Sequence, residues 1–305
     1  MKLGVIVPAY NEEASLAEVL GSIPRVIRDV GVTVFVVDDG SDDATAAIAA
    51  CSGAVVLSHR ERRGLAAAFR TGLAAALADK ADFIATIDAD GQYRGEELST
   101  LLGRLRAAKA ELVVGDRRVW GMRHMPLGNR IGNVIGSAML RLLARTGVND
   151  ASSGLRVFTA RCGRSLRISS EHTYTHEMLI QARAYGFTVI NETVTFLPRR
   201  HGRSKLVRTL RHHILRSCGT ILRALFLFHP LRKFLLLSLV FCLFAALIVV
   251  WPLIHGGVWT GTSAILGGLM FVVALQFLVL GIIADSFASQ RRLLTEEATL
   301  PARSS

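Results

Sequence analysis

Residues 234–254 read FLLLSLVFCLFAALIVVWPLI, a run of 21 residues without a charged side chain. A second uncharged run extends from about 262 to 284. As a helix, each run is long enough to cross a hydrocarbon core of about 30 Å. The alternative is a pair of buried helices in a soluble protein. We expect transmembrane helices at about 234–254 and 262–284, in a membrane region of 233–305 with a short cytoplasmic tail.

The charges around these runs are unevenly distributed. Residues 193–284 contain no acidic residue, and ten lysines and arginines fall within residues 199–233. A basic band directly before an apolar run favours a membrane-surface contact. Because no interleaved aromatic residues accompany the arginines, the pattern argues against a nucleic-acid partner.

Basic residues also flank the two apolar runs on their outer sides, namely Arg232 and Lys233 before the first and Arg291 and Arg292 after the second. The positive-inside rule therefore predicts a multi-pass protein of the cytoplasmic membrane. Its N-terminal domain and both termini are expected in the cytoplasm.

The segment before the first run interleaves arginines with leucine, isoleucine and phenylalanine near helical spacing, in LVRTLRHHILRSCGTILRALFLF at 206–228. This pattern is typical of an amphipathic helix in the headgroup layer. A helix on the surface of a soluble domain is the alternative. We therefore assign residues 206–232 to amphipathic interfacial helices and residues 1–205 to a cytoplasmic domain.

In the cytoplasmic domain, short β-branched runs alternate with Ala- and Leu-rich stretches. The runs predict strands at 3–7, 32–37, 54–57, 83–87, 112–114 and 187–196. The stretches between and after them predict helices at about 14–29, 42–51, 65–79, 96–108, 126–145 and 174–185. This alternation indicates an α/β fold with a mainly parallel sheet and helices on both faces. In such sheets ligands bind beyond the carboxyl ends of the strands.

Acidic residues follow three of the predicted strands. Asp88 and Asp90 end the run at 83–87, Asp38 and Asp39 follow the run at 32–37, and Glu12 follows the first strand. Two carboxylates one residue apart repel each other unless a positive charge lies near them. Hard oxygen ligands suit Mg²⁺ or Mn²⁺ arriving with a diphosphate. The alternative is a purely structural role, in which DDGS is a turn and Ser41 caps a helix.

Taken together, these motifs resemble family-2 glycosyltransferases of the GT-A fold. The resemblance is carried by VPAYNEE (7–13), VVDDGSDDAT (36–45), RRGLAAAFRTG (62–72), DADGQY (88–93), GDRR (115–118), NDASSGLRVF (149–158) and RRHGRSKL (199–206). Within that family the chain is similar to the polyprenyl-phosphate (dolichyl-phosphate) sugar synthases over about residues 1–230. The two-span tail is like that of bacterial members.

The resemblance implies an inverting, metal-dependent transfer of a sugar from a nucleotide-diphospho-sugar to a polyprenyl phosphate. A UDP donor is slightly favoured over a GDP donor, with Mg²⁺ or Mn²⁺ as cofactor. Membrane lipids are the further partners, and related two-span enzymes can form tetramers, so a homo-oligomer is part of the expectation. The alternatives are another membrane-bound family-2 glycosyltransferase, for a glycolipid or a polysaccharide, and an inactive GT-A membrane scaffold.

The resemblance also implies roles for single residues. The nucleotide would contact Pro8, Tyr10, Glu12 and Asp39, and the metal and diphosphate would contact Asp88, Asp90 and Gln92. The acceptor phosphate would bind Arg117 and Arg130, with Ser137 a weaker candidate. Asp150 and Arg156 would lie at the donor sugar and reaction centre, so the catalytic candidates are Asp90, Asp150, Arg117 and Arg130.

The same resemblance assigns Arg200, Ser204 and Lys205 to a loop that closes over the diphosphate. Glu177 either reaches the donor sugar or is ordinary helix surface. Two positions depart from the family pattern, because Leu155 stands where an aromatic residue is frequent and Tyr93 where a histidine is common. Both departures leave the choice of sugar open.

Overall fold

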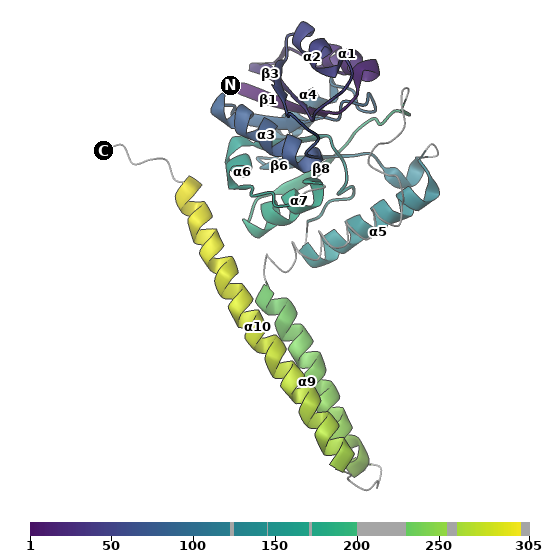
Figure 1. The fold of residues 1–305 in the computed structure, drawn as a ribbon, viewed down its shortest axis with the longest axis vertical. Helices are drawn as coiled ribbons and strands as arrows, with labels where there is room; N and C mark the ends of the chain where they lie inside the picture. Colours follow the sequence, from purple (N-terminus) through teal and green to yellow (C-terminus); the bar gives the residue numbers. More distant parts are fainter. Residues whose placement is uncertain (123–124, 145, 171–172, 200–229, 255–260, 300–305) are drawn as a thin grey trace, which may run out of the picture. The chain divides into compact units, whose positions relative to one another are not determined.

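The computed structural model describes residues 1–122, 125–144, 146–170, 173–199, 230–254 and 261–299. The chain divides into two compact units, Met1–Leu222 and Arg223–Ser305 (Figure 1). The predicted interfacial segment at 206–232 lies outside the described residues except for its last three, 230–232, which belong to α9 (Pro230–Ile254). The predicted domain boundaries at 205 and 232 therefore stay predictions.

The first unit is built on one eight-stranded sheet in the order β2-β3-β1-β5-β7-β6-β8, with β4 also paired to β3. Strands β1, β3, β4 and β5 run parallel, as do β6 and β8, whereas β7 lies antiparallel between β5 and β6. The α/β fold with a mainly parallel sheet is thus confirmed. The strands are β1 (Lys2–Ala9), β2 (Val26–Ile27), β3 (Val30–Asp38), β4 (Val55–Ser58), β5 (Phe83–Thr86), β6 (Leu112–Asp116), β7 (Arg156–Thr159) and β8 (Val189–Thr193).

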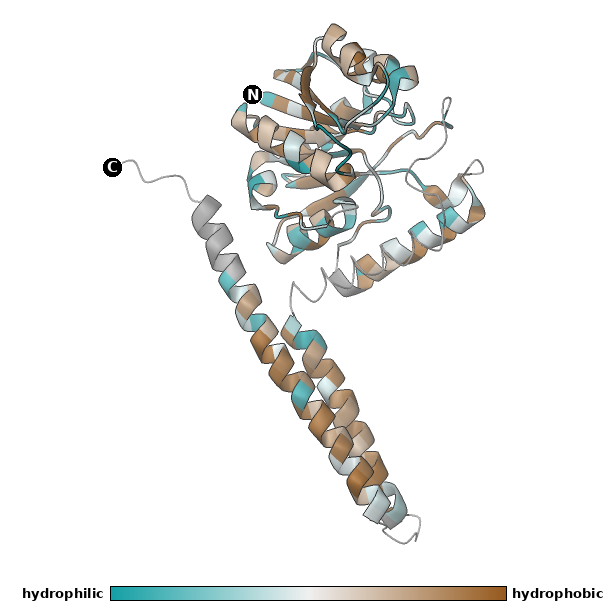
Figure 2. Cartoon of the chain, in the orientation of Figure 1, coloured by the Kyte–Doolittle hydropathy of each residue, from teal (hydrophilic) through white to brown (hydrophobic). Residues whose placement is uncertain are grey.

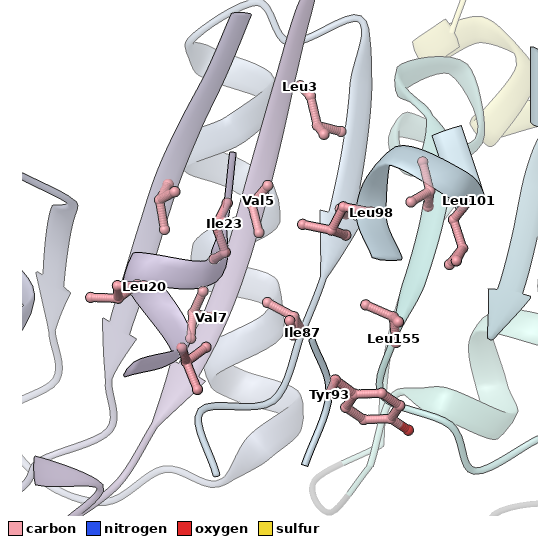
Figure 3. Packing of buried hydrophobic residues seen from close by; sticks show 14 of the residues in the cluster. Leu3, Val5, Val7, Leu20, Ile23, Ile87, Tyr93, Leu98, Leu101 and Leu155 are labelled. Carbon is pink, nitrogen blue, oxygen red and sulfur yellow. The ribbon is translucent and has the colours of Figure 1, made fainter. Parts of the chain in front are cut away.

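Helices cover both faces of this sheet. On one face, α1 (Glu13–Ser22), α2 (Thr45–Cys51) and α4 (Glu97–Ala107) bury their apolar side chains against Leu3, Val5 and Val7 (Figure 3). On the other face α3 (Leu65–Ala78) packs closely on β1, since a Cβ at Gly72 would lie 2.4 Å from Ile6 Cγ2. The other helices in the described part of the unit are η1 (Val119–Gly121), α5 (Leu127–Ala144), α6 (Ala160–Ser165) and α7 (Thr175–Ala184).

The strand register brings three loops to one edge of the sheet. Ala9 pairs with Asp38 across β1 and β3, and Ile6 pairs with Thr86 across β1 and β5. The backbone N–H of Asp39 then donates to the carbonyl of Ala9 at 2.8 Å, just beyond the last pair. The loops that follow β1, β3 and β5 therefore leave the sheet side by side, as the carboxyl ends of parallel strands do.

One local expectation was wrong, and one strand was not predicted. The helix predicted at 14–29 ends at Ser22, and the chain then forms the short hairpin of β2 with β3. Pro24 explains the early end, because a proline disfavours helical backbone in the residue before it; Ile23 is extended, with ψ 118°. Strand β7 was not predicted, since it begins inside the motif that had been assigned to the reaction centre.

The described residues of the second unit form two long helices, α9 (Pro230–Ile254) and α10 (Gly261–Thr299), which pack on each other. Both are long and apolar enough to cross a membrane (Figure 2). Only 11% and 17% of the residues in their apolar windows are buried, so they differ from core helices of a soluble protein. Phe277 of α10 stacks on Phe234 and Phe241 of α9. The two predicted spans at 234–254 and 262–284 lie within these helices.

Candidate active site

The loops at the carboxyl edge of the sheet enclose a pocket. Six residues singled out in the sequence line it, together with residues from the start of α3 and with Arg199. The lining residues are Pro8, Ala9, Tyr10, Glu12, Asp39, Arg62, Gly64, Leu65, Ala68, Asp88, Ala89, Asp90 and Arg199. The predicted nucleotide contacts Pro8, Tyr10, Glu12 and Asp39 therefore face the same space as Asp88 and Asp90.

Hydrogen bonds tie the loops after β1 and β3 to each other. The N–H of Asn11 donates to Ser41 Oγ, and the N–H of Asp42 donates to Asn11 Oδ1, both at 2.9 Å. The N–H of Glu12 donates to Thr45 Oγ1 at 2.9 Å. Asn11 adopts a left-handed backbone with φ 52°, a conformation that asparagine tolerates better than most residues. Tyr10 and Glu12 are thereby positioned by the DDGS segment.

The carboxylate of Asp39 accepts hydrogen bonds from the segment that connects β4 to α3. Its Oδ1 accepts from His59 Nδ1 at 2.7 Å and from the Arg63 N–H at 2.9 Å. Its Oδ2 accepts from the Gly64 N–H at 2.7 Å. The His59 and Asp39 side chains are both 6% exposed. Asp39 is thus a fixed group of the pocket, and the turn-only interpretation of DDGS is too narrow.

The paired carboxylates of DADG lie beside a cation supplied by the chain itself. Arg199 Nη2 donates to Asp90 Oδ2 at 2.5 Å. Burial and the neighbouring Asp90 carboxylate raise the pKa of Asp88 to about 7, although Arg117, Arg199 and Arg156 act in the opposite direction. Asp88 also packs tightly on Gly154, where a Cβ would lie 2.2 Å from Asp88 Oδ2.

The chemistry of this pair fits a divalent cation that brings ligands of its own. Within the described residues, no group of three or more His, Cys, Asp or Glu is placed to hold a metal ion. Mg²⁺ and similar ions are commonly bound by one or two carboxylates together with substrate phosphates. Asp88 and Asp90 match that donor set, and the guanidinium of Arg199 stands in for a cation at Asp90.

Gln92 and Tyr93 fix the turn that carries Asp90. The backbone carbonyl of Gln92 accepts from the Leu197 N–H at 2.8 Å. The side-chain amide of Gln92 donates to the backbone carbonyl of Leu197 at 3.2 Å. The Tyr93 hydroxyl, buried beneath, lies 3.1 Å from both Ser153 Oγ and the Gly154 nitrogen. Gln92 does not line the pocket, so its metal contact stays a prediction.

A second cluster forms around the ion pair of Arg117 and Asp150. Arg117 Nε and Nη2 reach the two oxygens of Asp150 at 2.5 and 2.8 Å, and Nη2 also donates to Ser152 Oγ at 2.7 Å. Asn133 of α5 donates to Asp150 Oδ1 at 3.0 Å and bonds Ser152. Burial alone would raise the pKa of Asp150, but its bonds to Arg117 and Asn133 lower the pKa below its ordinary value.

Arg130 and Ser137 lie on α5 without joining this ion pair. The Arg130 guanidinium bonds the Trp120 carbonyl and lies over the Trp120 ring, 5.6 Å from its centre. Ser137 Oγ accepts from the Ala151 N–H at 3.0 Å and thus supports the loop that carries Asp150. Their contact with an acceptor phosphate stays a prediction.

Arg156 and Glu177 are buried inside the domain. The Arg156 guanidinium donates to the backbone carbonyls of Ser153, Thr175 and Ala151 at 2.7 to 2.9 Å. Both oxygens of Glu177 accept from the loop at 169–170. These contacts account for both side chains as structural supports, and Glu177 is 2% exposed, so it is not ordinary helix surface.

Three residues of the site were missed in the sequence. Arg199 was counted in the basic band and in the RRHGRSKL motif but was given no role in the site, although it bonds Asp90. Asn133 lies one turn after Arg130, a spacing that places both near one face of α5. His59 follows β4 directly, at the same edge of the sheet as the other loops. Arg200, Ser204 and Lys205 lie outside the described residues.

Comparison with known proteins agrees with this geometry. The model of the glycosyl transferase family 2 matches residues 4–161. A glycosyltransferase of Mycobacterium bovis is 35% identical over 69% of this chain and 92% of its own length. The undecaprenyl-phosphate mannosyltransferase of Micrococcus luteus is 30% identical over 68% of this chain and 88% of its own.

A solved structure supports the same assignment. Glucosyl-3-phosphoglycerate synthase from Mycobacterium tuberculosis, in complex with Mn²⁺, UDP and glucosyl-3-phosphoglycerate, superimposes with a TM-score of 0.55. It is 27% identical, and the match covers 72% of this chain and 80% of that one. With the sheet order, the acidic pocket and these matches together, the chain belongs to glycosyl transferase family 2 and has the GT-A type of fold.

Proposed function

We propose that this chain transfers a sugar, with inversion at the anomeric carbon, from a nucleotide-diphospho-sugar to a polyprenyl phosphate in the membrane. The observation that carries the proposal is the pocket that Asp39, Asp88 and Asp90 line together with Arg199. Carboxylates for a cation lie there beside an arginine that suits a diphosphate. A relative is named as an undecaprenyl-phosphate mannosyltransferase, and this chain has two helices long and apolar enough to cross a membrane.

The donor would lie along the carboxyl edge of the sheet. Tyr10, Glu12 and Asp39 would contact the nucleoside, and Asp88 and Asp90 would face the diphosphate. We favour a UDP donor over a GDP donor, supported by the UDP in the related synthase. A bound Mg²⁺ or Mn²⁺ would neutralise charge that develops on the leaving diphosphate.

The residues of this chain would do the remaining work. An oxygen of the acceptor phosphate forms a bond to the anomeric carbon while the bond from that carbon to the nucleoside diphosphate breaks. The acceptor is ionised near neutral pH and needs orientation rather than a general base. Arg117, whose guanidinium is held by Asp150, which Asn133 also contacts, would orient this phosphate. Arg199 would release Asp90 and bind the diphosphate of the donor instead.

The surface of α5 supports a lipid acceptor. Apolar side chains form a stripe along this helix at Leu127, Ile131, Ile135 and Leu142, and they are 41% to 79% exposed. Helical spacing places Asn133 on the opposite side, where it contacts Asp150. An exposed apolar stripe is typical of helices that lie in the membrane interface. The stripe would bring the acceptor's headgroup to the Arg117 cluster.

The membrane arrangement follows from the charges beside the two helices. Arg232 and Lys233 lie in the first turn of α9, ahead of its apolar run, and Arg291 and Arg292 follow the apolar part of α10. We therefore place the catalytic domain and both termini in the cytoplasm. A homo-oligomer, such as a tetramer, stays a prediction.

A donor screen tests the proposal. The full chain in lipid nanodiscs is incubated with Mn²⁺, undecaprenyl phosphate and a panel of radiolabelled UDP- and GDP-sugars. Label should move into the organic phase for at least one donor, and Asp90→Ala should abolish the transfer. NMR of the product's anomeric configuration checks inversion. Binding of nucleotide without any transfer would favour the scaffold alternative, and labelling of a lipid that lacks phosphate would favour a glycolipid enzyme.

A further inference from the structure

The inference concerns His59, a residue behind the pocket, and rests on the proposed function in that the pocket binds a nucleotide with its base at Asp39. His59 does not line the pocket; Asp39, which it contacts, does. Its ring bridges two elements, with Nδ1 2.7 Å from Asp39 and Nε2 2.9 Å from Thr71 Oγ1 on α3. Its backbone N–H donates to the Asp38 carbonyl at 2.9 Å. The ring is therefore held at both ends.

The contacts of Asp39 limit what this carboxylate can still accept. A carboxylate offers about four lone-pair positions, two on each oxygen. Oδ1 uses both, for His59 and for the Arg63 N–H, and Oδ2 uses one for the Gly64 N–H. About one position then remains, on Oδ2. Asp39 therefore offers the pocket one free acceptor position, not two acceptor oxygens side by side.

Nucleobases differ in the number of donors that they bring to such a group. The pairing edge of uracil carries a single N–H between two carbonyls. Guanine carries two neighbouring donors, its ring N–H and its amino group, which match both oxygens of a carboxylate at once. Cytosine has an unprotonated ring nitrogen there, which a carboxylate repels. One remaining acceptor position therefore matches uracil, whereas guanine would leave a buried donor without a partner.

We propose that His59 is a specificity-determining residue, which occupies Oδ1 of Asp39 and so selects a uracil base over guanine. Two of the three donors to Asp39 are backbone amides and do not depend on side-chain identity. His59 is the one side chain among the three donors recorded for Asp39 in the described residues. Thr71 positions the ring, and loss of either contact would free Oδ1 for a second donor.

Nucleotide binding without acceptor tests the proposal. Isothermal titration of the full chain in nanodiscs with Mn²⁺ compares UDP, GDP, CDP and N3-methyl-UDP. The wild type should bind UDP roughly tenfold or more tightly than the other three, the penalty expected for one unpaired buried group. His59→Ala should narrow the ratio of UDP to GDP affinity, mainly through tighter GDP binding.

Matched variants separate selectivity from structure. His59→Asn places an amide N–H where Nδ1 stood and should restore the ratio, while Thr71→Val should shift it partway. Thermal unfolding checks that each variant is folded. A His59→Ala protein that loses UDP and GDP affinity equally would show a merely structural role and overturn the proposal, as would a wild type that binds GDP as well as UDP.

The same protein samples distinguish this inference from the proposed function. Sugar transfer to polyprenyl phosphate with equal use of UDP- and GDP-donors would leave the function standing and overturn the role of His59. Selective UDP binding that changes with His59, but without any transfer in the donor screen, would support the role of His59 and overturn the function.

Discussion

Arg199 Nη2 donates to Asp90 Oδ2 across 2.5 Å and thereby joins two segments that lie 109 residues apart in the chain. Both side chains are largely covered, at 20% and 13% exposed. A divalent cation bound at Asp90, as we propose, would compete with this guanidinium for the same carboxylate oxygen. The ion pair therefore links metal binding to the position of Arg199, and each should weaken the binding of the other.

Arg199→Ala should tighten the binding of Mn²⁺ in the absence of the nucleotide sugar. The metal ion then no longer has to displace the Arg199 guanidinium from Asp90. We expect a change of roughly threefold to tenfold, typical of one partly buried charge pair. Electron paramagnetic resonance of free Mn²⁺ measures it in the full chain. Arg104→Ala is the control, since Arg104 pairs with Glu192 in an exposed ion pair. Equal Mn²⁺ affinity in wild type and Arg199→Ala would contradict the exchange.

Gly154→Ala should disturb the acidic pair without touching an acid. A Cβ at position 154 would lie 2.2 and 2.5 Å from the two oxygens of Asp88, so the carboxylate has to move. We expect metal-dependent binding of UDP to weaken by roughly tenfold or more, as small misplacements at reacting groups often do. Titration of UDP with Mn²⁺ measures the loss.

Gly103→Ala provides the matched control for this change. Gly103 lies in α4, and a Cβ there would meet nothing within 4 Å. Alanine is also the better helix former, so this variant should be as stable as the wild type or slightly more stable. Normal UDP binding by Gly154→Ala would mean that the position of Asp88 is not required.

The sequence predicts the frame of the site better than its contacts. Strand ends are readable because apolar runs such as VTVFVV at 32–37 stop at polar residues, and parallel strands bring those ends to one edge. The contacts of Arg199 with Asp90 and of His59 with Asp39 connect residues 109 and 20 positions apart. No periodicity encodes such pairs. For Arg156 the motif predicted a contact with the donor sugar. In the structure its guanidinium donates to three backbone carbonyls instead.

Asp150→Ala should destabilise the catalytic domain by about 3 to 5 kcal/mol, because it leaves the Arg117 charge buried without its partner. The Asp150 side chain is 1% exposed. Thermal unfolding of the detergent-solubilised full chain measures the change. Asp29→Ala, which breaks an exposed pair with Arg106, should leave unfolding unchanged. Equal effects of the two variants would contradict this assignment.

The same ion pair gives a pH dependence of stability. The pKa of Asp150 is lowered in the folded protein, relative to about 3.9 when unfolded. Its contribution is therefore fully present above the unfolded pKa and is lost as the pH falls through the folded pKa. The difference in unfolding free energy between wild type and Asp150→Asn should be full at about pH 7 and shrink below about pH 4. A difference that grows on acidification would contradict the sign.

Glu177→Ala should act on stability rather than on donor binding. Glu177 accepts from the backbone N–H groups of Ser169 and Ser170 and from Gln181. Loss of these charge-assisted bonds should lower the unfolding free energy by about 3 kcal/mol. The KM for the donor, measured well below the unfolding temperature, should stay within roughly twofold of the wild type. A large rise in the KM for the donor, with normal stability, would support the predicted contact of Glu177 with the donor sugar.

Asn133 and Arg117 should act as one unit in acceptor use. Asn133 contacts Asp150, which in turn holds both Nε and Nη2 of Arg117. Asn133→Ala should therefore raise the KM for polyprenyl phosphate and leave UDP binding unchanged. Because the contact acts through Asp150, the change should add little once Arg117 is already alanine. Non-additivity of about 0.5 to 3 kcal/mol is typical of residues in one network.

A double-mutant cycle of Asn133→Ala and Arg117→Ala measures this coupling from kcat/KM for the acceptor. Arg130→Ala is the informative comparison, since Arg130 bonds the Trp120 carbonyl and none of its contacts within the described residues reaches Asp150. Its effect should add to that of Arg117→Ala. Additive effects of Asn133 and Arg117 would show that α5 reaches the acceptor by another route than the Asp150 ion pair.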